Sequence, residues 1–233
     1  MKPLPSAQLY EEELRFMPYR DSLAWVESLV SPHTPINGTL LDLMCGPGYL
    51  LGRIKQVRKD ISAIGVDIDE RYVDYGNRKY PGIRFEVGDV EKWQPKGQHD
   101  LVLCTGALHH IPYDNQERLL ERIPSMMKPD GFFILSDCYV DDYSNESERK
   151  LAAAKLGYEY LRETIKNGAP KEVIQTLIDI LQNDVMMDEF KTSIVKRLPI
   201  LRKIFTNVHL RKVWPIDERS EYGDYIAICR RGK

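Results

Sequence analysis

Acidic and glycine residues stand where apolar segments of this chain end, and their types suit a nucleotide-like ligand. Asp42 closes one apolar segment and precedes a turn that contains Gly46 and Gly48, while Asp67 closes the next segment. Glycines let the backbone approach a ligand closely, and a carboxylate at the second position can accept both hydroxyls of a ribose. A strand, a tight glycine loop and a helix start are together the usual place where an α/β protein holds such a ligand.

The elements that must position these residues alternate between strand and helix patterns. The strand patterns cover residues 39–43, 62–67, 83–87, 100–104 and 131–136. The helix patterns cover residues 7–17, 21–30, 48–58, 69–79 and 115–127, with a break at Pro18. Apolar strands that alternate with helices predict a parallel sheet covered on both faces, whose ligands bind beyond the carboxyl ends of the strands. The residues that fall at these ends are Asp42, Asp67, Asp89 and Thr105.

The pattern changes after residue 138. Residues 144–198 have helical spacing with few strand signals, and strand patterns return at 207–213 and 224–230. No helix pattern separates these last two strands, so we expect them to pair antiparallel. The helical block, residues 139–204, leaves from the binding edge, and we expect it to form a lid there. We therefore expect a single domain with N-terminal covering helices (1–35), a binding core (36–138), the lid and a C-terminal β-hairpin (205–233).

Composition narrows the class of protein. The 233 residues fit one large domain, and the apolar content of 42% suits a globular core. We expect no membrane contact because no run of about 18 apolar residues occurs, and a cytoplasmic location because the N-terminus lacks the apolar core of a signal peptide. The net charge of −2 and the dispersed basic residues disfavour nucleic acid as a partner. The four cysteines are too far apart in sequence to form a metal pair, and we expect them to be reduced.

Five motifs together resemble those of the class I S-adenosylmethionine-dependent methyltransferases. They are LDLMCGPG at 41–48, GVDID at 65–69, VGDV at 87–90, HDLVLCTGALHHI at 99–111 and MKPDGFFIL at 127–135. The resemblance covers residues 36–137 well and the C-terminal strands in outline. It implies an α/β, Rossmann-like seven-stranded sheet with an antiparallel final strand and a helical insertion between strands five and six. It also implies S-adenosyl-L-methionine as cofactor and S-adenosyl-L-homocysteine as product. Met44 departs from the family, which more often has glycine there, and a larger side chain fits if its φ is negative.

The resemblance also implies roles for the residues at the binding edge. Asp42 should orient the amino group of the cofactor, and Gly46 and Gly48 should approach its methionine and ribose parts. Asp67 should bind the ribose hydroxyls, with Ile68 packed on the adenine.

Three further positions complete the cofactor site that the family implies, and one more covers it. Asp89 should accept from the adenine amino group, and the backbone of Val90 should donate to the ring. Thr105 should begin the loop beneath the methionine part. Arg20 lies in an N-terminal segment that folds over the cofactor in related enzymes, where its guanidinium could pair with the cofactor carboxylate.

His109 and His110 are the catalytic candidates, because the loop after the fourth strand should bring one of them near the transferred methyl group. Histidine can remove a proton from a hydroxyl or amine near neutral pH, and we favour His110 for that role. Methyl transfer often needs only alignment of the nucleophile with the methyl carbon, so a base is not essential. We expect no metal, since no cluster of acids and histidines stands out in the sequence.

Competing functions remain open to different degrees. A NAD-dependent dehydrogenase is disfavoured because Leu51 stands where the dinucleotide fingerprint needs its third glycine. We expect a methyltransferase acting on an oxygen or nitrogen of a small molecule, in a monomer or homodimer. The alternatives are an enzyme similar to carboxy-S-adenosylmethionine synthases, which would carry a carboxylated cofactor, and a partner-dependent protein or tRNA methyltransferase, which would expose an apolar or basic patch. Candidate pocket residues in the insertion are Tyr139, Tyr143, Tyr158, Tyr160, Met186, Met187 and Phe190.

Overall fold

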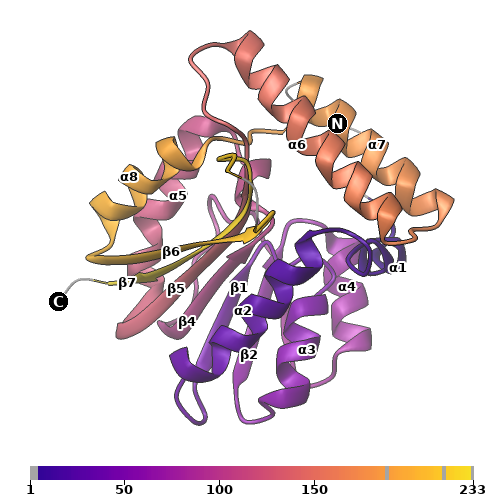
Figure 1. The fold of residues 1–233 in the computed structure, drawn as a ribbon. Helices are drawn as coiled ribbons and strands as arrows, with labels where there is room; N and C mark the ends of the chain where they lie inside the picture. Colours follow the sequence, from indigo (N-terminus) through magenta and orange to yellow (C-terminus); the bar gives the residue numbers. More distant parts are fainter. Residues whose placement is uncertain (1–4, 187–188, 217–218, 232–233) are drawn as a thin grey trace.

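A seven-stranded sheet forms the centre of the molecule, with the strand order β3-β2-β1-β4-β5-β7-β6 (Figure 1). This computed structural model describes residues 5–186, 189–216 and 219–231. The strands are β1 (Thr39–Leu43), β2 (Ser62–Asp67), β3 (Arg84–Val87), β4 (His99–Thr105), β5 (Met127–Tyr139), β6 (Asn207–Trp214) and β7 (Gly223–Arg230). The first five pair in parallel, and β7 runs antiparallel between β5 and β6. The predicted sheet, including its antiparallel end, is confirmed.

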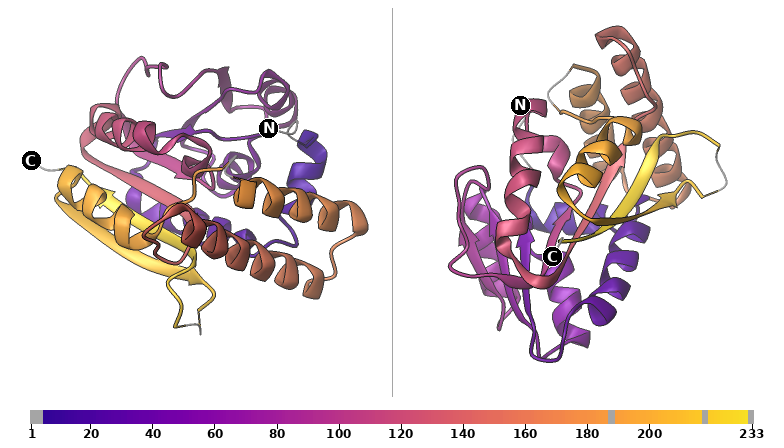
Figure 2. Two further views of the ribbon diagram at one scale, coloured as in Figure 1. Left: turned by 90° about the horizontal axis from the view of Figure 1, so that it is seen from above. Right: turned by 90° about the vertical axis from the view of Figure 1, so that its left-hand side faces the viewer.

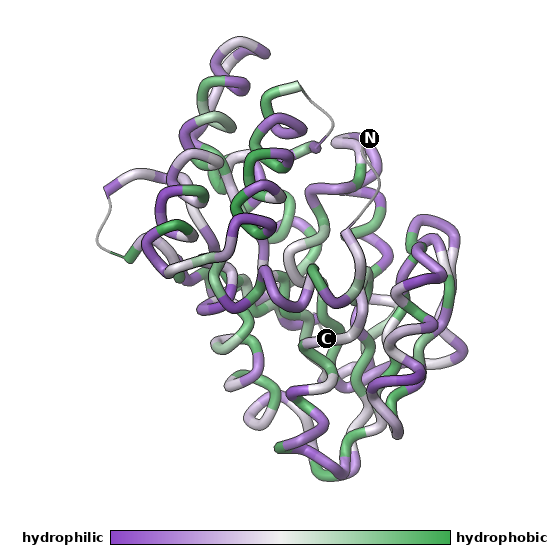
Figure 3. Tube along the Cα trace, turned by 90° about the vertical axis from the view of Figure 1, so that its right-hand side faces the viewer, coloured by the Kyte–Doolittle hydropathy of each residue, from purple (hydrophilic) through white to green (hydrophobic). Residues whose placement is uncertain are grey.

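Two layers of helices cover the sheet. In chain order, the helices of the described residues are α1 (Ala7–Glu13), α2 (Tyr19–His33), α3 (Tyr49–Val57), α4 (Glu70–Lys79), the 3₁₀-helix η1 (Leu108–His110), α5 (Tyr113–Met126), α6 (Glu146–Lys166), α7 (Lys171–Met186) and α8 (Ile194–Ile204). Successive strand residues point to opposite faces, so Leu40 packs with α2, α3 and α4 while Leu41 packs with α5 and α8. Hydrophobic residues gather along the strands between these layers (Figure 3).

The helices α1, α6 and α7 lie beyond the carboxyl ends of the strands, as Figures 1 and 2 show. They share an apolar cluster with the end of β5, in which Leu156, Val173 and Leu177 are buried. Since these side chains pack on one another rather than on the sheet, α6 and α7 form a separate layer over the binding edge. The last helix of the inserted block, α8, instead packs beside α5 on one face of the sheet.

One local expectation needs correction. Met44 has φ = 56°, in the left-handed region, and not the negative φ at which its side chain would fit without strain. This conformation costs roughly 1–2 kcal/mol in a residue other than glycine. Its half-buried side chain packs against the core formed with α5, a contact that offsets part of this cost. Across the described residues, no helix is both long and apolar enough to span a membrane.

Candidate functional site

The loop between β1 and α3 is fixed to the end of β2 by backbone hydrogen bonds. The Cys45 N–H donates to the carbonyl of Val66 at 3.0 Å, and the Gly46 N–H donates to the Asp67 carboxylate at 2.8 Å. Gly46 and Gly48 both have positive φ, which lets the chain turn sharply before it enters the helix. A Cβ on Gly48 would lie 2.4 Å from the ring of Phe85, so this position also needs glycine for packing. The loop is thus anchored to the end of β2 and packed closely against Phe85.

Asp42 and Asp67 lie on the neighbouring strands β1 and β2 at this edge, with Asp42 opposite Gly65 and Asp67 two residues further along β2. Burial, and then the charge of Asp67, raise the pKa of Asp42 to about 7. The Asp42 side chain is 1% exposed, and its Oδ1 has no hydrogen-bond partner among the described residues. Burial likewise raises the pKa of Asp67, although backbone N–H groups of Asp69 and Gly46 oppose that effect. A buried, unpaired carboxyl favours a cationic ligand group, because an ammonium would supply the missing partner.

The predicted adenine region lies at the adjacent strand ends. Ile68 is 68% exposed, so its apolar side chain lies at the surface beside the buried acid. Asp89 is ion-paired with Lys92 at 3.1 Å, and this bond lowers its pKa. Val90 is buried, and its carbonyl accepts from Arg122 at 2.8 Å. The geometry leaves the Ile68 side chain as an open apolar surface next to the acids.

Two tyrosines of the N-terminal segment cover two loops at this edge, Tyr10 the glycine loop and Tyr19 the loop after β4. The Tyr10 ring lies 3.6 Å from the point where a Cβ of Gly46 would be, and the Tyr19 ring lies 2.6 Å from the equivalent point at Gly106. The Tyr19 hydroxyl also faces the Thr105 side chain. Arg20, by contrast, is exposed and bonds to Asp21 and to the carbonyl of Arg15. The covering segment is therefore in place, but the rings of Tyr10 and Tyr19, rather than the Arg20 guanidinium, face these loops.

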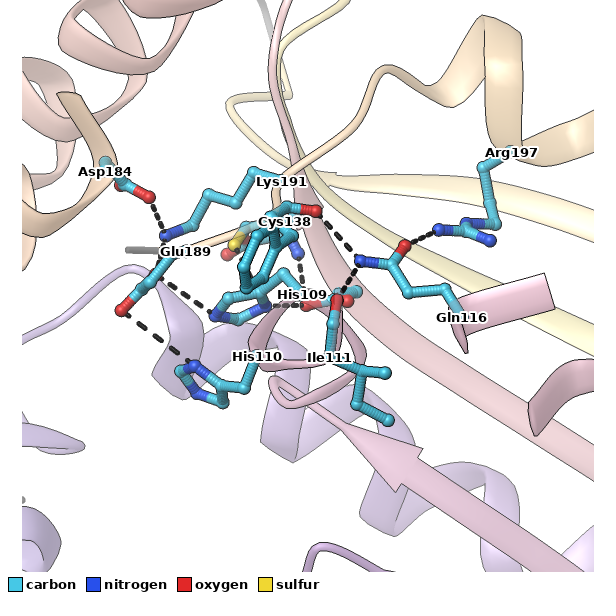
Figure 4. Close-up of polar contacts among 12 residues, drawn as sticks. His109, His110, Ile111, Gln116, Cys138, Asp184, Glu189, Lys191 and Arg197 are labelled. Carbon is cyan, nitrogen blue, oxygen red and sulfur yellow. Dashed lines mark hydrogen bonds and ion pairs between the residues drawn. The ribbon is translucent and has the colours of Figure 1, made fainter. Parts of the chain in front are cut away.

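His109 is the centre of a buried polar cluster (Figure 4). Its Nδ1 lies 2.6 Å from the carboxylate of Asp137 and 3.8 Å from the Cys138 sulfur, both at the end of β5. Burial alone would lower the pKa of His109, but the Cys138 and Asp137 side chains raise it well above its usual value. The Asp137 carboxylate at 2.6 Å therefore favours the protonated, hydrogen-bond-donating form of His109.

Residues 189–191 of the insertion close over this histidine. The Phe190 N–H donates to the carbonyl of His109 at 2.7 Å. Glu189 lies 3.5 Å from His109 Nε2 and is ion-paired with Lys191, whose ammonium also bonds to Asp184 at 2.6 Å. The insertion is thus attached to the loop after β4 by charged groups as well as by backbone.

His110 differs from its neighbour in exposure and charge. Its side chain is 46% exposed, and Nδ1 lies 3.9 Å from Glu189. Partial loss of hydration and then repulsion from the charged His109 lower the pKa of His110. With a pKa of about 4 it is an uncharged imidazole near neutral pH, with a free acceptor nitrogen but weaker basicity than an ordinary histidine.

The same cluster could contribute metal ligands. His109, His110 and Glu189 place ligand atoms within 4.8 Å of one another, as do His109, Asp137 and Cys138. However, Asp137 already binds His109 and Lys191 already neutralises Glu189, so a metal ion would have to displace a buried cation. The absence of a metal stays a prediction.

A cavity of about 370 Å³ lies between α1, α6, α7 and η1. Tyr10, Tyr19 and Gly106 belong to its wall, and so do both histidines, so the cavity adjoins the glycine loop. Its polar and charged lining residues include Glu13, His109, His110, Asp179, Asp184, Glu189 and Lys191. Of the pocket residues expected in the insertion, Tyr160 lines this cavity and Met187 lies outside the described residues. The others expected there are absent from the described lining: Tyr139, Tyr143, Tyr158, Met186 and Phe190.

Sequence reasoning missed several members of this site. Asp137 follows the same rule as Asp42 and Asp67, since it lies near the carboxyl end of β5, which pairs in parallel with β4, and that signal could have found it. Glu13, Glu189 and Lys191 come from helical or irregular segments with no such regularity.

Comparison with known proteins gives this geometry a context. Residues 40–131 match the family described as a methyltransferase domain. Trans-aconitate 2-methyltransferase of Sinorhizobium medicae (strain WSM419) is 30% identical over 120 residues, which are 52% of this chain and 44% of that protein. Ubiquinone biosynthesis O-methyltransferase of Bordetella avium (strain 197N) is 24% identical over 174 residues, which are 70% of this chain and 67% of that protein. The chain spans less than half the length of the trans-aconitate methyltransferases that it matches.

Solved structures share the whole fold at low identity. The plantazolicin methyltransferase BpumL in complex with SAH superposes with a TM-score of 0.64 and 13% identity, over 97% of this chain and 90% of that one. A TehB-like SAM-dependent methyltransferase from Corynebacterium glutamicum has a TM-score of 0.53 and 16% identity, over 97% and 98%. The likeness therefore extends to α6 and α7 as well as to the sheet.

Proposed function

We propose that this chain, whose residues 40–131 match the family described as a methyltransferase domain, is a class I S-adenosylmethionine-dependent methyltransferase that transfers a methyl group to an oxygen or nitrogen of a small molecule. The convergence of Asp42, Gly46 and Asp67 at one sheet edge, directly beside a cavity, carries this proposal. The cavity volume of about 370 Å³ is within the usual range for small-molecule sites.

The residues present suit the cofactor. The unpaired Asp42 carboxyl would bind its ammonium, Asp67 its ribose hydroxyls, and the exposed Ile68 side chain its adenine. Asp89, Val90, Gly48 and Thr105 complete the proposed site. When bound, the cofactor supplies an electrophilic methyl group. Arg20 would have to leave Asp21 before it could reach a carboxylate, so its role stays a prediction.

The chain's own groups would orient the acceptor and exclude water. His109 is positioned by Asp137 and can donate a hydrogen bond toward the cavity, whereas the neutral His110 can take a proton from the acceptor. We keep His110 as the catalytic candidate and regard His109 as the positioning residue, because a histidine that is already protonated cannot act as a base.

Isothermal titration calorimetry with S-adenosylhomocysteine tests the proposal. We expect micromolar binding to wild type and a loss of at least tenfold in Asp67→Asn, since the amide keeps the shape but removes the charge that the ribose hydroxyls bind. The exposed Asp74 on the following helix provides the control Asp74→Asn, which should bind as wild type does. Failure of well-folded wild type to bind would refute the proposed function.

A further inference from the structure

The cavity beside the glycine loop has an excess of acidic side chains. Among the described lining residues, the carboxyl groups are those of Glu13, Asp179, Asp184 and Glu189, whereas Lys191 is the one lysine and arginine does not occur. Its remaining wall is largely apolar, with side chains of α1, α6 and α7 such as Leu14, Leu156 and Leu177. An acceptor that fits this wall has an apolar body and at least one group that a carboxylate binds.

The cations of the cavity are already neutralised. Lys191 bonds to both Asp184 and Glu189, and the charged His109 bonds to Asp137. An anionic substrate would therefore have to displace a buried ion pair, which is costly because one carboxylate would be left without its partner. A tricarboxylate, the substrate class in the name of the trans-aconitate relative, is poorly suited to this cavity.

Glu13, in contrast, lacks a cationic partner in the described structure. Its side chain is 3% exposed, lines the cavity from α1, and has no hydrogen-bond partner for Oε1. The Thr176 hydroxyl of α7 faces the same carboxyl. A buried acid with an unsatisfied oxygen is destabilising unless a donor binds it, and an ammonium is the strongest donor that could enter.

We propose that the acceptor substrate is a small amphiphilic amine whose cationic nitrogen binds Glu13 while its carbon skeleton lies along the apolar wall. This inference rests on the proposed function and narrows its substrate class. The raised pKa of Glu13, about 7 as a result of burial, is consistent with a carboxyl that lacks a counter-charge. An incoming ammonium would lower that pKa and favour the ion pair.

Three probes of equal chain length separate charge from apolar contact: n-hexylamine, 1-hexanol and hexanoate. Each is titrated by calorimetry into protein saturated with S-adenosylhomocysteine. We expect the amine to bind at least tenfold more tightly than the alcohol, and hexanoate more weakly than either. If wild-type protein binds the three probes with equal affinity, or prefers hexanoate, the inference is overturned without any variant.

A matched pair of variants then locates the cation site. Glu13→Gln should lower the affinity for n-hexylamine to the level of 1-hexanol. Glu12→Gln, one residue away on the exposed side of α1, should keep the wild-type ratio of amine to alcohol affinity. A folded Glu13→Gln variant that keeps the full preference for the amine would contradict the role of Glu13. If S-adenosylhomocysteine itself does not bind, the proposed function fails; if it binds and the amine has no advantage, only this inference fails.

Discussion

Binding of S-adenosylhomocysteine should depend on pH through Asp42. The carboxyl is buried, and its pKa is about 7 in the protein without ligand. If only the ionised form binds the ligand ammonium, the affinity is proportional to the ionised fraction, which is about 3% at pH 5.5 and about 50% at pH 7.0. The affinity for S-adenosylhomocysteine should therefore rise roughly 16-fold from pH 5.5 to pH 7.0, which corresponds to about 1.6 kcal/mol of binding free energy.

The sign of the effect follows from where the proton is bound. The folded protein holds a proton on Asp42 that the unfolded chain releases near pH 4, so this group lowers stability as the pH rises from about 4 to 7. Ligand binding removes the same proton, and the affinity therefore rises over that interval. Calorimetry in two buffers with different ionisation enthalpies should detect about one proton released at pH 5.5.

The variant Asp42→Asn isolates this contribution. Glu13 and Asp224 also have pKa values of about 7, and both remain in the variant, so their effects cancel in the comparison. We expect Asp42→Asn to bind more weakly at pH 7.0 and to lose most of the 16-fold gain. Equal pH dependence in the two proteins would refute the reasoning, because the linked proton would then belong to another group.

Three further perturbations test the packing and charge of the site by urea unfolding. Gly48→Ala introduces a Cβ 2.4 Å from an aromatic ring and should lower the free energy of unfolding by about 1–3 kcal/mol. Gly97→Ala, whose Cβ would have no atom within 4 Å, should leave it nearly unchanged, and similar losses in the two variants would contradict the steric argument. Met44→Gly should be more stable than Met44→Ala by about 1 kcal/mol, because the left-handed φ of 56° strains alanine, and the reverse order would contradict this. Asp137→Asn should lower the free energy of unfolding by about 2 kcal/mol near pH 7, because it removes the negative charge beside His109. The difference from wild type should shrink as the pH falls through the lowered pKa of Asp137, and a difference that stays constant would count against the ion pair.

The sheet and its binding edge could be predicted because their signals are local. Strands β1 and β2 have the bounds expected from the apolar pattern, and the glycine loop follows directly from residue types at fixed spacing. The acids at the strand ends converge because parallel strands end at one edge.

The cavity wall could not be predicted in the same way. Glu13 and Glu189 are more than 170 positions apart and meet the cavity from α1 and from the segment before α8. No periodic pattern relates two such segments, since their distance is set by how α6 and α7 pack. The orientation of Arg20 could not be predicted either, because an exposed side chain at a helix start has several hydrogen-bond partners within range.

The position of Tyr10 and Tyr19 bears on the order of events during turnover. The Tyr10 ring covers Gly46 of the glycine loop, the Tyr19 ring covers Gly106 after β4, and both rings belong to the wall of the proposed acceptor cavity. Under the proposed function, we expect the segment that carries them to move aside when the methyl donor enters, so that the acceptor cavity is complete only after the segment returns. Donor binding should therefore precede acceptor binding, and the demethylated donor should leave last. In steady-state terms the enzyme would follow an ordered sequential scheme, in which S-adenosylhomocysteine competes with the donor and not with the acceptor.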